Sequence, residues 1–304
     1  MSVITSIKGF TNLGNTCYMN AAIQALLSSD ILNNVILIYS EKHPNRVEKF
    51  SPVLIEYVRL VLDFMMDNNQ SSIYSPHKFK KIIDKENAFF RGHAQHCPSE
   101  FISYLINEFA ETAKEKGIAK IMNQICFGKY KEYICCDVCK NVIVGYAPFL
   151  EVPLPIPDTP NPDLDECFKK FAIYETLDEK NNRWTCPTCQ MKVVAHKRME
   201  IFEVPEVAIF TFNRFKNAQK NNTPIKLYPR IKLENRRLRL IATVNHYGGL
   251  NGGHYVAYVS RGNVWYRADD SSIRRDDIKS VLNDSSVFMV VYQIEYDSTG
   301  DDSD

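Results

Sequence analysis

The hydrophobic pattern along the chain changes between its two halves. In the first 120 residues, apolar side chains recur at helical spacing, as at Phe101, Leu105 and Phe109, which would lie on one face of a helix. From about Val142 the pattern changes to a period of two, in segments such as residues 238–247, and this period is typical of strands. We therefore expect a mainly helical first half and a second half that is mainly antiparallel sheet.

Capping and helix-breaking residues mark the ends of the predicted helices. Ser51 and Pro52 suit an N-cap and a first helical position, so a helix is predicted to begin there, and residues 75–76 repeat the signal. Another helix is predicted to open at Pro98 and to close at Gly117.

Two segments are predicted to lack regular structure. The proline-rich residues 152–162 (VPLPIPDTPNP) are expected to form an irregular connection. The final DSTGDDSD is too polar to pack, and a disordered acidic tail is predicted there.

Composition excludes several classes of protein. A chain of 304 residues with 45% hydrophobic residues can bury a large core. Its net charge is +1, with acidic and basic residues interspersed, so neither nucleic acid nor an anionic membrane is an expected partner. No apolar run approaches the ~20 residues that span a bilayer. We expect an intracellular protein of the cytoplasm, the nucleus or both.

A single cysteine separates a turn-forming segment from a helical pattern in GFTNLGNTCYMNAAIQAL, residues 9–26. Asn12 and Gly14 favour a tight turn, and the apolar residues within 19–26 have helical spacing. Cys17 is therefore predicted near a helix N-terminus, where the helix dipole and free N–H groups would lower the pKa of its thiol. A buried structural cysteine is the alternative, and this stretch alone favours neither.

Among the seven histidines, His254 has the context of a catalytic base. It follows a glycine-rich segment, which lets the backbone approach a ligand, and it begins a strand pattern. A predicted hairpin turn at residues 261–262 would bring Asp269 or Asp270 back to its imidazole, although by themselves these aspartates would suit a solvated turn. His246 is the weaker candidate. The other histidines are predicted to be at the surface or structural.

These stretches resemble the ubiquitin-specific proteases, a family of papain-like cysteine proteases. GFTNLGNTCYMNAAIQAL resembles the Cys box of that family, and NHYGGLNGGHYVAYV with WYRADDSSI resembles its His box. FFRGHAQHCPSEFISYLINEF, EVAIFTFNRF and KLYP are similar to family segments between the boxes. The resemblance covers the chain from Gly9 to about Tyr292.

The resemblance implies roles for individual residues. Cys17 would be the nucleophile, His254 the general base and acid, and Asp269 the carboxylate that orients His254. Asn12 matches the family position whose side chain helps to hold the oxyanion. Asp270, which follows Asp269, is assigned no firm role.

The resemblance also predicts a channel for the C-terminal tail of ubiquitin. Cys97 occupies a position that is usually aspartate in the family, where the carboxylate lies beside arginines of the tail. A neighbouring acid such as Glu100 could compensate, the protein could bind the ubiquitin tail weakly, or it could act on a modifier with a less basic tail. Weaker binding is the expectation. Gly252 and Gly253 belong to a loop that would leave space only for glycine-like residues, so the enzyme would cut after Gly-Gly.

The cysteines indicate a metal site. The chain has nine cysteines, an odd number, and its first residues lack the apolar segment of a secretion signal. Both observations argue against a disulfide framework. Two CxxC pairs, Cys136 with Cys139 and Cys186 with Cys189, would give a closed tetrahedral Zn²⁺ site of structural type. A redox dithiol is the alternative for one pair. In the family such a zinc ion ties the tip of the fingers, and the match of CDVC favours Cys136 over Cys135.

The fold that the resemblance implies is α+β, a papain-like cysteine protease with a helical thumb, a β palm and zinc-ribbon fingers. Residues 1–8 would be a lead-in and residues 9–295 the catalytic domain. Within that domain the thumb would cover about residues 9–120, and the fingers and palm about 121–295. Residues 296–304 would be the acidic tail.

The implied activity is that of a deubiquitinating thiol protease, which hydrolyses the (iso)peptide bond after the C-terminal Gly-Gly of ubiquitin. Its partners would be ubiquitin and ubiquitinated proteins, and we expect a monomer. A protease for a ubiquitin-like modifier is one alternative. A module that binds ubiquitin without cutting it is another, although the retained Cys17, His254 and Asp269 argue against it.

Overall fold

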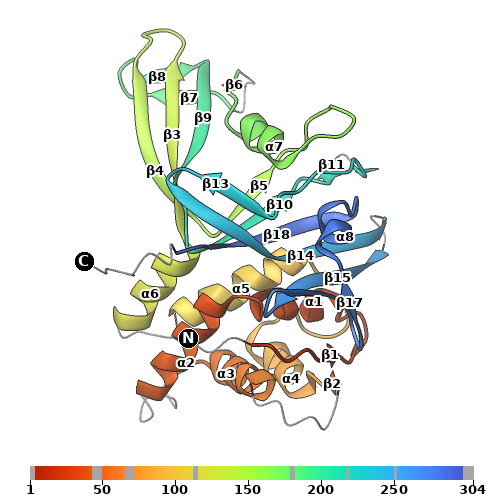
Figure 1. The fold of residues 1–304 in the computed structure, drawn as a ribbon. Coiled ribbons are helices and arrows are strands. Elements are labelled where there is room, and N and C mark those ends of the chain that lie inside the picture. The colour runs from red at the N-terminus through yellow and green to blue at the C-terminus, as the bar shows by residue number, and fades with distance from the viewer. Residues whose placement is uncertain are drawn as a thin grey trace, which may run out of the picture.

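The computed structural model describes residues 4–42, 50–65, 72–111, 116–178, 182–216, 219–249 and 252–296. It contains a layer of helices, a long central sheet above them, and a four-stranded sheet that projects from one end (Figure 1). The helical layer comes from the first part of the chain and most strands from the second, as the hydrophobic pattern predicts. The predicted tail, apart from Tyr296, lies outside the described residues.

The helical layer follows the predicted pattern with one error. α3 begins where expected, because the Ser51 hydroxyl accepts a hydrogen bond from the Leu54 N–H at 3.1 Å. The prediction of a single helix from Pro98 to Gly117 is wrong, since Gly117 lies in the first turn of the separate helix α6. Glycine is tolerated at a helix start as well as after a helix end, so its position was ambiguous. The layer consists of α1 (Cys17–Leu26), α2 (Asp30–Lys42), α3 (Pro52–Met65), α4 (His77–Glu86), α5 (Pro98–Glu111) and α6 (Lys116–Cys126).

The central sheet has the strand order β17-β16-β15-β14-β18-β10-β5, and β13 also pairs with β14. Its strands are β5 (Glu151–Leu154), β10 (Val207–Phe212), β13 (Arg230–Leu233), β14 (Arg236–Gly249), β15 (Gly252–Arg261), β16 (Val264–Asp269), β17 (Ser272–Asp276) and β18 (Val287–Ile294). The pairs are antiparallel except for β10 with β5. The hairpin between β15 and β16 turns at residues 262–263, one position later than predicted.

Strand β5 corrects a second prediction. The proline-rich segment 152–162 was expected to be irregular, yet its first three residues pair with β10, with Val152 opposite Phe210. Pro153 fits because β5 is the edge strand, where a missing N–H leaves no ladder partner unsatisfied.

Both faces of the central sheet are covered, which explains why every residue of β10 is buried. Val207 and Ile209 join the core formed with the helical layer. Phe210 belongs to a second core on the opposite face, where its ring lies 5.0 Å from that of Phe168. Phe168 belongs to α7 (Leu164–Phe171), and α8 (Ile278–Leu282) also contributes to this second core.

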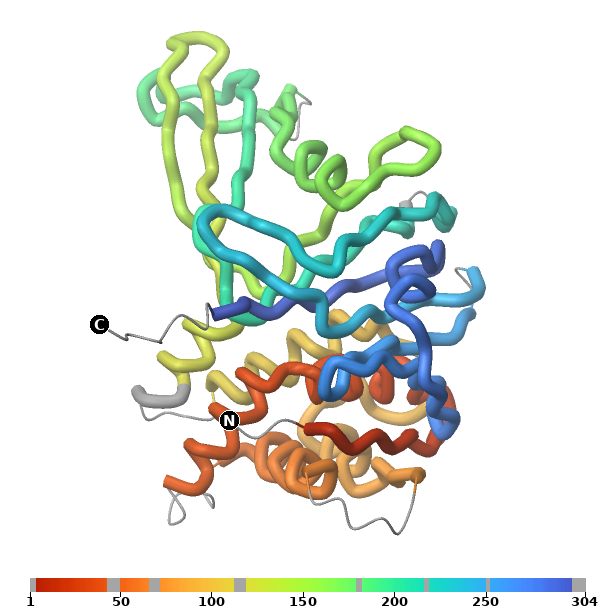
Figure 2. Tube along the Cα trace, in the orientation of Figure 1, coloured from red at the N-terminus to blue at the C-terminus, as the bar shows by residue number. Residues whose placement is uncertain are grey.

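The N-terminal segment lies beside the C-terminal strands (Figure 2). β1 (Gly9–Phe10) pairs with β2 (Ile73–Tyr74), and the Phe10 N–H donates to the Asp270 carbonyl at 2.8 Å. This contact places the segment before Cys17 next to the turn that follows Asp269.

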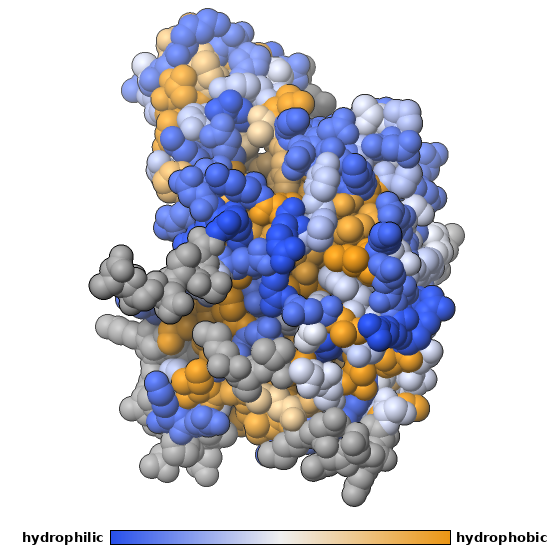
Figure 3. Space-filling view, in the orientation of Figure 1, coloured by the Kyte–Doolittle hydropathy of each residue, from blue (hydrophilic) through white to orange (hydrophobic). Residues whose placement is uncertain are grey.

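The projecting sheet has the order β4-β3-β9-β6. Its strands are β3 (Gly128–Cys136), β4 (Val142–Phe149), β6 (Glu175–Leu177) and β9 (Ala195–Glu203), with the hairpin of β7 (Trp184–Cys186) and β8 (Met191–Val193) near its tip. Apolar surface is visible on this part of the molecule (Figure 3), and Val142, Val144 and Tyr146 are exposed at alternate positions of β4. In addition, β11 (Phe215–Lys216) pairs antiparallel with β12 (Gln219–Lys220).

Within the described parts of the chain, no helix alone has the length and apolar character to cross a bilayer. α1 and α2 would meet that test only as a pair, and they are bent by 82° at a short break.

The N-cap of α7 gives a pH-dependent prediction. Asp163 accepts a hydrogen bond from the Glu166 N–H at 2.9 Å and another from the Tyr228 hydroxyl at 2.8 Å. The Glu166 N–H is the main cause that holds the pKa of Asp163 below its usual value. Asp163→Ala should therefore lower the free energy of unfolding by about 1–2 kcal/mol at pH 7. Because the folded-state pKa is depressed, this contribution is present above the unfolded pKa and is lost as pH falls through the folded value.

Urea unfolding at pH 7 and at pH 3 measures this difference. Asp163→Asn is the matched control: it keeps an oxygen acceptor for the cap but does not titrate, so at pH 7 it should lose less stability than Asp163→Ala. An equal loss for Asp163→Ala at both pH values would contradict the assignment.

Candidate active site

Cys17 is the first residue of α1, as predicted. The loop before it is held by Asn12, whose Oδ1 accepts from the Gly14 N–H at 3.0 Å and the Thr16 N–H at 3.1 Å. Gly14 has φ +96°, a conformation that glycine adopts without strain. The turn-forming residues therefore place the thiol at the start of the helix.

The hairpin of β15 and β16 brings His254 and Asp269 together. His254 Nε2 lies 2.6 Å from Asp269 Oδ1, and Arg267 Nη1 donates to Asp269 Oδ2 at 2.7 Å. Burial alone would raise the pKa of Asp269, but the hydrogen bonds from His254 and Arg267 outweigh it and hold that pKa below its usual value. The carboxylate is thus ionised at neutral pH and fixes the imidazole through Nε2, which leaves Nδ1 free for another partner.

The expectation that the helix N-terminus lowers the pKa of the Cys17 thiol is wrong in direction. Cys17 is only 4% exposed, and burial raises the pKa of its thiol. The nearby backbone N–H of Tyr255 opposes this effect, while the negative charge of Asp270 adds to it. The sequence does not show how deeply a residue is buried. Here the effect of desolvation, which raises the thiol pKa, is larger than the lowering effect of the backbone amides at the helix start. The Tyr255 contact places the thiol beside the strand that carries His254.

Asp270 has a structural position that the sequence did not reveal. Its Oδ2 accepts from Asn12 Nδ2 at 2.8 Å, and its Oδ1 accepts from Asn20 Nδ2 at 2.7 Å. One carboxylate thereby joins the loop before Cys17, helix α1 and the turn after Asp269. The amide of Asn12, the predicted oxyanion donor, is oriented by this contact. Only the adjacent pair of aspartates could have suggested such a role.

A cavity of about 290 Å³ contains all four predicted substrate-binding residues, Cys97, Glu100, Gly252 and Gly253. The remaining residues that line it are Phe89, Gln95, His96, Phe215, His246, Gly249 and Tyr255. His96 was expected to be a surface or structural residue, yet it lies in this wall beside Cys97. A larger cavity of about 1250 Å³ lies between α6 and the base of the projecting sheet and contains none of the predicted site residues.

Glycine is required at position 253. A Cβ added there would lie 2.1 Å from His246 Nε2 and 2.7 Å from the Tyr247 carbonyl oxygen. Residues 250–251 of the predicted loop lie outside the described residues. Burial lowers the pKa of His246 to about 4, with further contributions from Lys220 and His254, so this imidazole is neutral. The described geometry pairs His254, not His246, with a carboxylate.

The thiol of Cys97 lies 3.2 Å from the Ser99 hydroxyl, and burial raises its pKa. Cys97 therefore offers a neutral group to the cavity at neutral pH. Glu100 lines the same cavity and is exposed, so the wall retains one carboxylate near this position.

Four cysteines meet near the tip of the projecting sheet. The Sγ atoms of Cys136 and Cys189 lie 3.9 Å apart, and those of Cys139 and Cys186 lie 3.7 Å apart. All four sulfurs lie within 4.8 Å of one another, an arrangement that could hold a metal ion. A tetrahedral ion with bonds of about 2.3 Å would separate its sulfur ligands by about 3.8 Å, so these distances fit. Cys135 is not part of the group.

Solved structures share this fold. The structure described as the SAGA Ubp8/Sgf11/Sus1/Sgf73 DUB module bound to ubiquitin aldehyde matches 97% of this chain and 71% of its own chain, with a TM-score of 0.81 and 21% identity. A second structure of the SAGA DUB module, bound to monoubiquitin, matches with a TM-score of 0.80, 22% identity and the same coverage. The predicted papain-like α+β fold, with helical thumb, β palm and projecting fingers, is confirmed.

Similar sequences are named ubiquitin carboxyl-terminal hydrolases. Ubiquitin carboxyl-terminal hydrolase 4 of Vanderwaltozyma polyspora is 28% identical over 340 residues, which cover 88% of this chain and 38% of that protein. The protein of the same name from Saccharomyces cerevisiae is 25% identical over 363 residues, 95% of this chain and 39% of its own. The chain thus spans about two fifths of the length of these relatives. A model of the ubiquitin carboxyl-terminal hydrolase family matches residues 8–292. The chain therefore belongs to the ubiquitin carboxyl-terminal hydrolase family.

Proposed function

We propose that this chain is a thiol-dependent deubiquitinase that hydrolyses the (iso)peptide bond after the C-terminal Gly-Gly of ubiquitin. The observation that carries the proposal is the 2.6 Å pair of His254 Nε2 and Asp269 Oδ1. His254 lies on β15 next to Tyr255, whose backbone N–H acts on the Cys17 thiol. A nucleophile, a base and a group that orients the base are the three parts that covalent acyl transfer requires.

The catalytic cycle follows from these contacts. The buried thiol of Cys17 is neutral at rest, so His254 Nδ1 accepts its proton as sulfur attacks the scissile carbonyl. The ionised Asp269, held by Arg267, stabilises the imidazolium that forms. His254 then donates the proton to the leaving amine, and water, activated by the same imidazole, releases ubiquitin from Cys17. The amide of Asn12 would donate to the oxyanion in both addition steps.

The cavity beside His254 suits the tail of ubiquitin. Gly252 and Gly253 form part of one wall, and neither adds a side chain to the cavity. Glu100 supplies a carboxylate for a basic residue of the tail, a charge-assisted contact of about 1.5–3 kcal/mol. The two similar structures hold ubiquitin aldehyde and monoubiquitin, which supports ubiquitin as the substrate.

Cys97 favours one alternative substrate. Because its neutral thiol replaces the aspartate usual in the family, the channel is less acidic, and this would suit a ubiquitin-like modifier with a less basic tail. Fluorogenic substrates made from ubiquitin and from such modifiers distinguish a deubiquitinase from a protease for a ubiquitin-like modifier. If no substrate of the panel were cleaved, a module that binds ubiquitin without cutting it would be the remaining function.

We further propose that the four cysteines hold one structural Zn²⁺. The sulfur positions fit a closed tetrahedral site, and a closed site leaves no position for substrate. The ion would tie the turn at Cys136 and Cys139 to the turn at Cys186 and Cys189, and catalysis would not involve it.

Cys17→Ala should abolish cleavage of ubiquitin-fluorophore while the fold and ubiquitin binding remain. His254→Ala should lower kcat by about four orders of magnitude and slow the reaction of Cys17 with a C-terminal electrophile on ubiquitin. Cys135→Ala, a thiol outside the site, is the control and should behave like the unmodified protein. Residual cleavage by pure Cys17→Ala, or unchanged labelling of His254→Ala, would contradict the assignment of the nucleophile or the base.

Elemental analysis should find one zinc ion per chain. Cys136→Ser or Cys189→Ser should lose the ion and lower the thermal unfolding temperature, because metal binding and folding of the two turns are coupled. Cys135→Ser should keep both the ion and the stability. Freshly purified protein without zinc would refute this part of the proposal.

Cys97→Asp should lower KM for ubiquitin substrates by about tenfold, since a carboxylate would gain a charge-assisted hydrogen bond to the tail. Cys97→Asn, of similar size but neutral, should leave KM unchanged. The gain should shrink when the tail arginine is removed from the substrate. An equal KM for Cys97→Asp and the unmodified protein on both substrates would mean that this position does not contact the tail.

A further inference from the structure

Arg261, the last residue of β15, carries a cation into the protein interior. It is only 3% exposed. Its Nη2 donates to the Gln24 carbonyl at 3.0 Å and to Gln24 Oε1 at 3.1 Å, and its Nη1 donates to the Ser28 hydroxyl and to the Ser260 carbonyl at 3.3 Å. Among the described residues it forms no ion pair. Burying a cation among neutral acceptors alone lowers the stability of the fold unless its hydrogen bonds are well made, and most of these bonds go to α1 and the residues directly after it.

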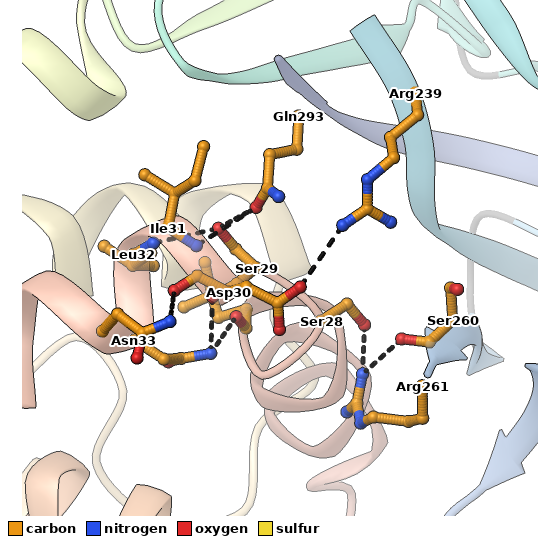
Figure 4. Close-up of polar contacts among 12 residues, drawn as sticks. Ser28, Ser29, Asp30, Ile31, Leu32, Asn33, Arg239, Ser260, Arg261 and Gln293 are labelled. Atoms are coloured by element: carbon orange, nitrogen blue, oxygen red, sulfur yellow. Dashed lines mark hydrogen bonds and ion pairs between the residues drawn. The ribbon is translucent and has the colours of Figure 1, made fainter. Parts of the chain in front are cut away.

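The same end of α1 is tied to two other strands of the palm (Figure 4). Gln293 Oε1 of β18 accepts from the Ser29 hydroxyl at 2.8 Å, and Arg239 Nη2 of β14 lies 3.3 Å from Asp30 Oδ2. Polar contacts therefore fasten the junction of α1 and α2 to β14, β15 and β18. Arg261 differs from the other two because its strand also carries His254.

α1 and β15 run alongside each other in the same direction. The two elements pack against each other, and at one end the Cys17 thiol lies beside the Tyr255 N–H. At the other end Gln24 and Ser28 accept from Arg261. The contact of Cys17 with Tyr255 at one end and the contacts of Arg261 at the other end thus define the position of α1 along the axis of β15. A displacement moves the thiol relative to the imidazole.

We propose that Arg261 is a positioning residue: its hydrogen bonds to Gln24 and Ser28 set the displacement of α1 along β15, and thereby the alignment of Cys17 with His254. This inference rests on the proposed catalytic roles of Cys17 and His254. Misplacement of a reacting group by 1 Å can cost about 10²-fold in rate. The planar guanidinium suits the task because it binds both oxygens of Gln24 and the Ser28 hydroxyl together, whereas a lysine ammonium has no such fork.

Arg261→Lys and Arg261→Met test the proposal in the full chain. Both should lower kcat for ubiquitin-fluorophore by tenfold or more, with KM within twofold, because the ubiquitin channel is not altered. The pH profile of Cys17 alkylation by iodoacetamide should shift to higher pH, since a thiol displaced from His254 loses its base. Arg275→Met, an exposed arginine on β17, is the matched control and should keep the original kcat and alkylation profile.

Folding is monitored by thermal unfolding, which separates positioning from stability. A lower unfolding temperature with an unchanged kcat and alkylation profile would overturn the proposal. If both Arg261 variants fail to fold, Ser28→Ala removes one acceptor with little change in volume, and it should move kcat and the profile in the same direction by a smaller amount. No change in that variant would also overturn it. If the unmodified protein does not cleave ubiquitin, the proposed function fails, while the alkylation profile still tests Arg261.

Discussion

The packing of α1 against β15 is the constraint on which the site depends. Every residue of α1 is buried, so packing holds the helix on the sheet and permits only small displacements along it. Its first residue, Cys17, therefore stays beside the Tyr255 amide. The same sheet pairs β15 with β16, which delivers Asp269 to His254. A cysteine at the start of a helix and a histidine–aspartate pair from a hairpin are brought to one region because one core holds both elements.

Burial affects the pKa of Cys17, His246 and Asp269, and the available partners decide the result. Desolvation raises the pKa of the Cys17 thiol and lowers that of His246 to about 4, so both groups are neutral at pH 7. Desolvation also opposes the ionisation of Asp269, but hydrogen bonds from His254 and Arg267 outweigh it. The site therefore holds an ionised carboxylate bound to the His254 imidazole and, at Cys17, a neutral buried thiol.

The fingers obey a different constraint. At their tip the buried apolar cluster contains little more than Cys136, Cys186 and Val193, whereas the palm has large cores on both faces. Apolar burial alone stabilises such a small cluster weakly. The two CxxC turns bring their sulfurs to distances that suit a metal ion, which would replace the missing core. The two CxxC pairs are thus placed in the part of the chain where the apolar core is smallest.

Local sequence was sufficient for features that depend on neighbouring residues. The helix start at Cys17, the cap at Ser51 and the two CxxC turns follow from turn chemistry within a few positions, and the family motifs identified His254 with Asp269. Features that depend on distant contacts could not be obtained this way. The raised pKa of Cys17 arises from burial, which depends on the segments that pack around the residue. The neutral acceptors of Arg261 are likewise set by which segment packs against β15. Strand β5 forms in a proline-rich segment because a sheet edge was available for it. Periodicity and capping are properties of the chain, whereas desolvation and pairing exist only once remote segments meet.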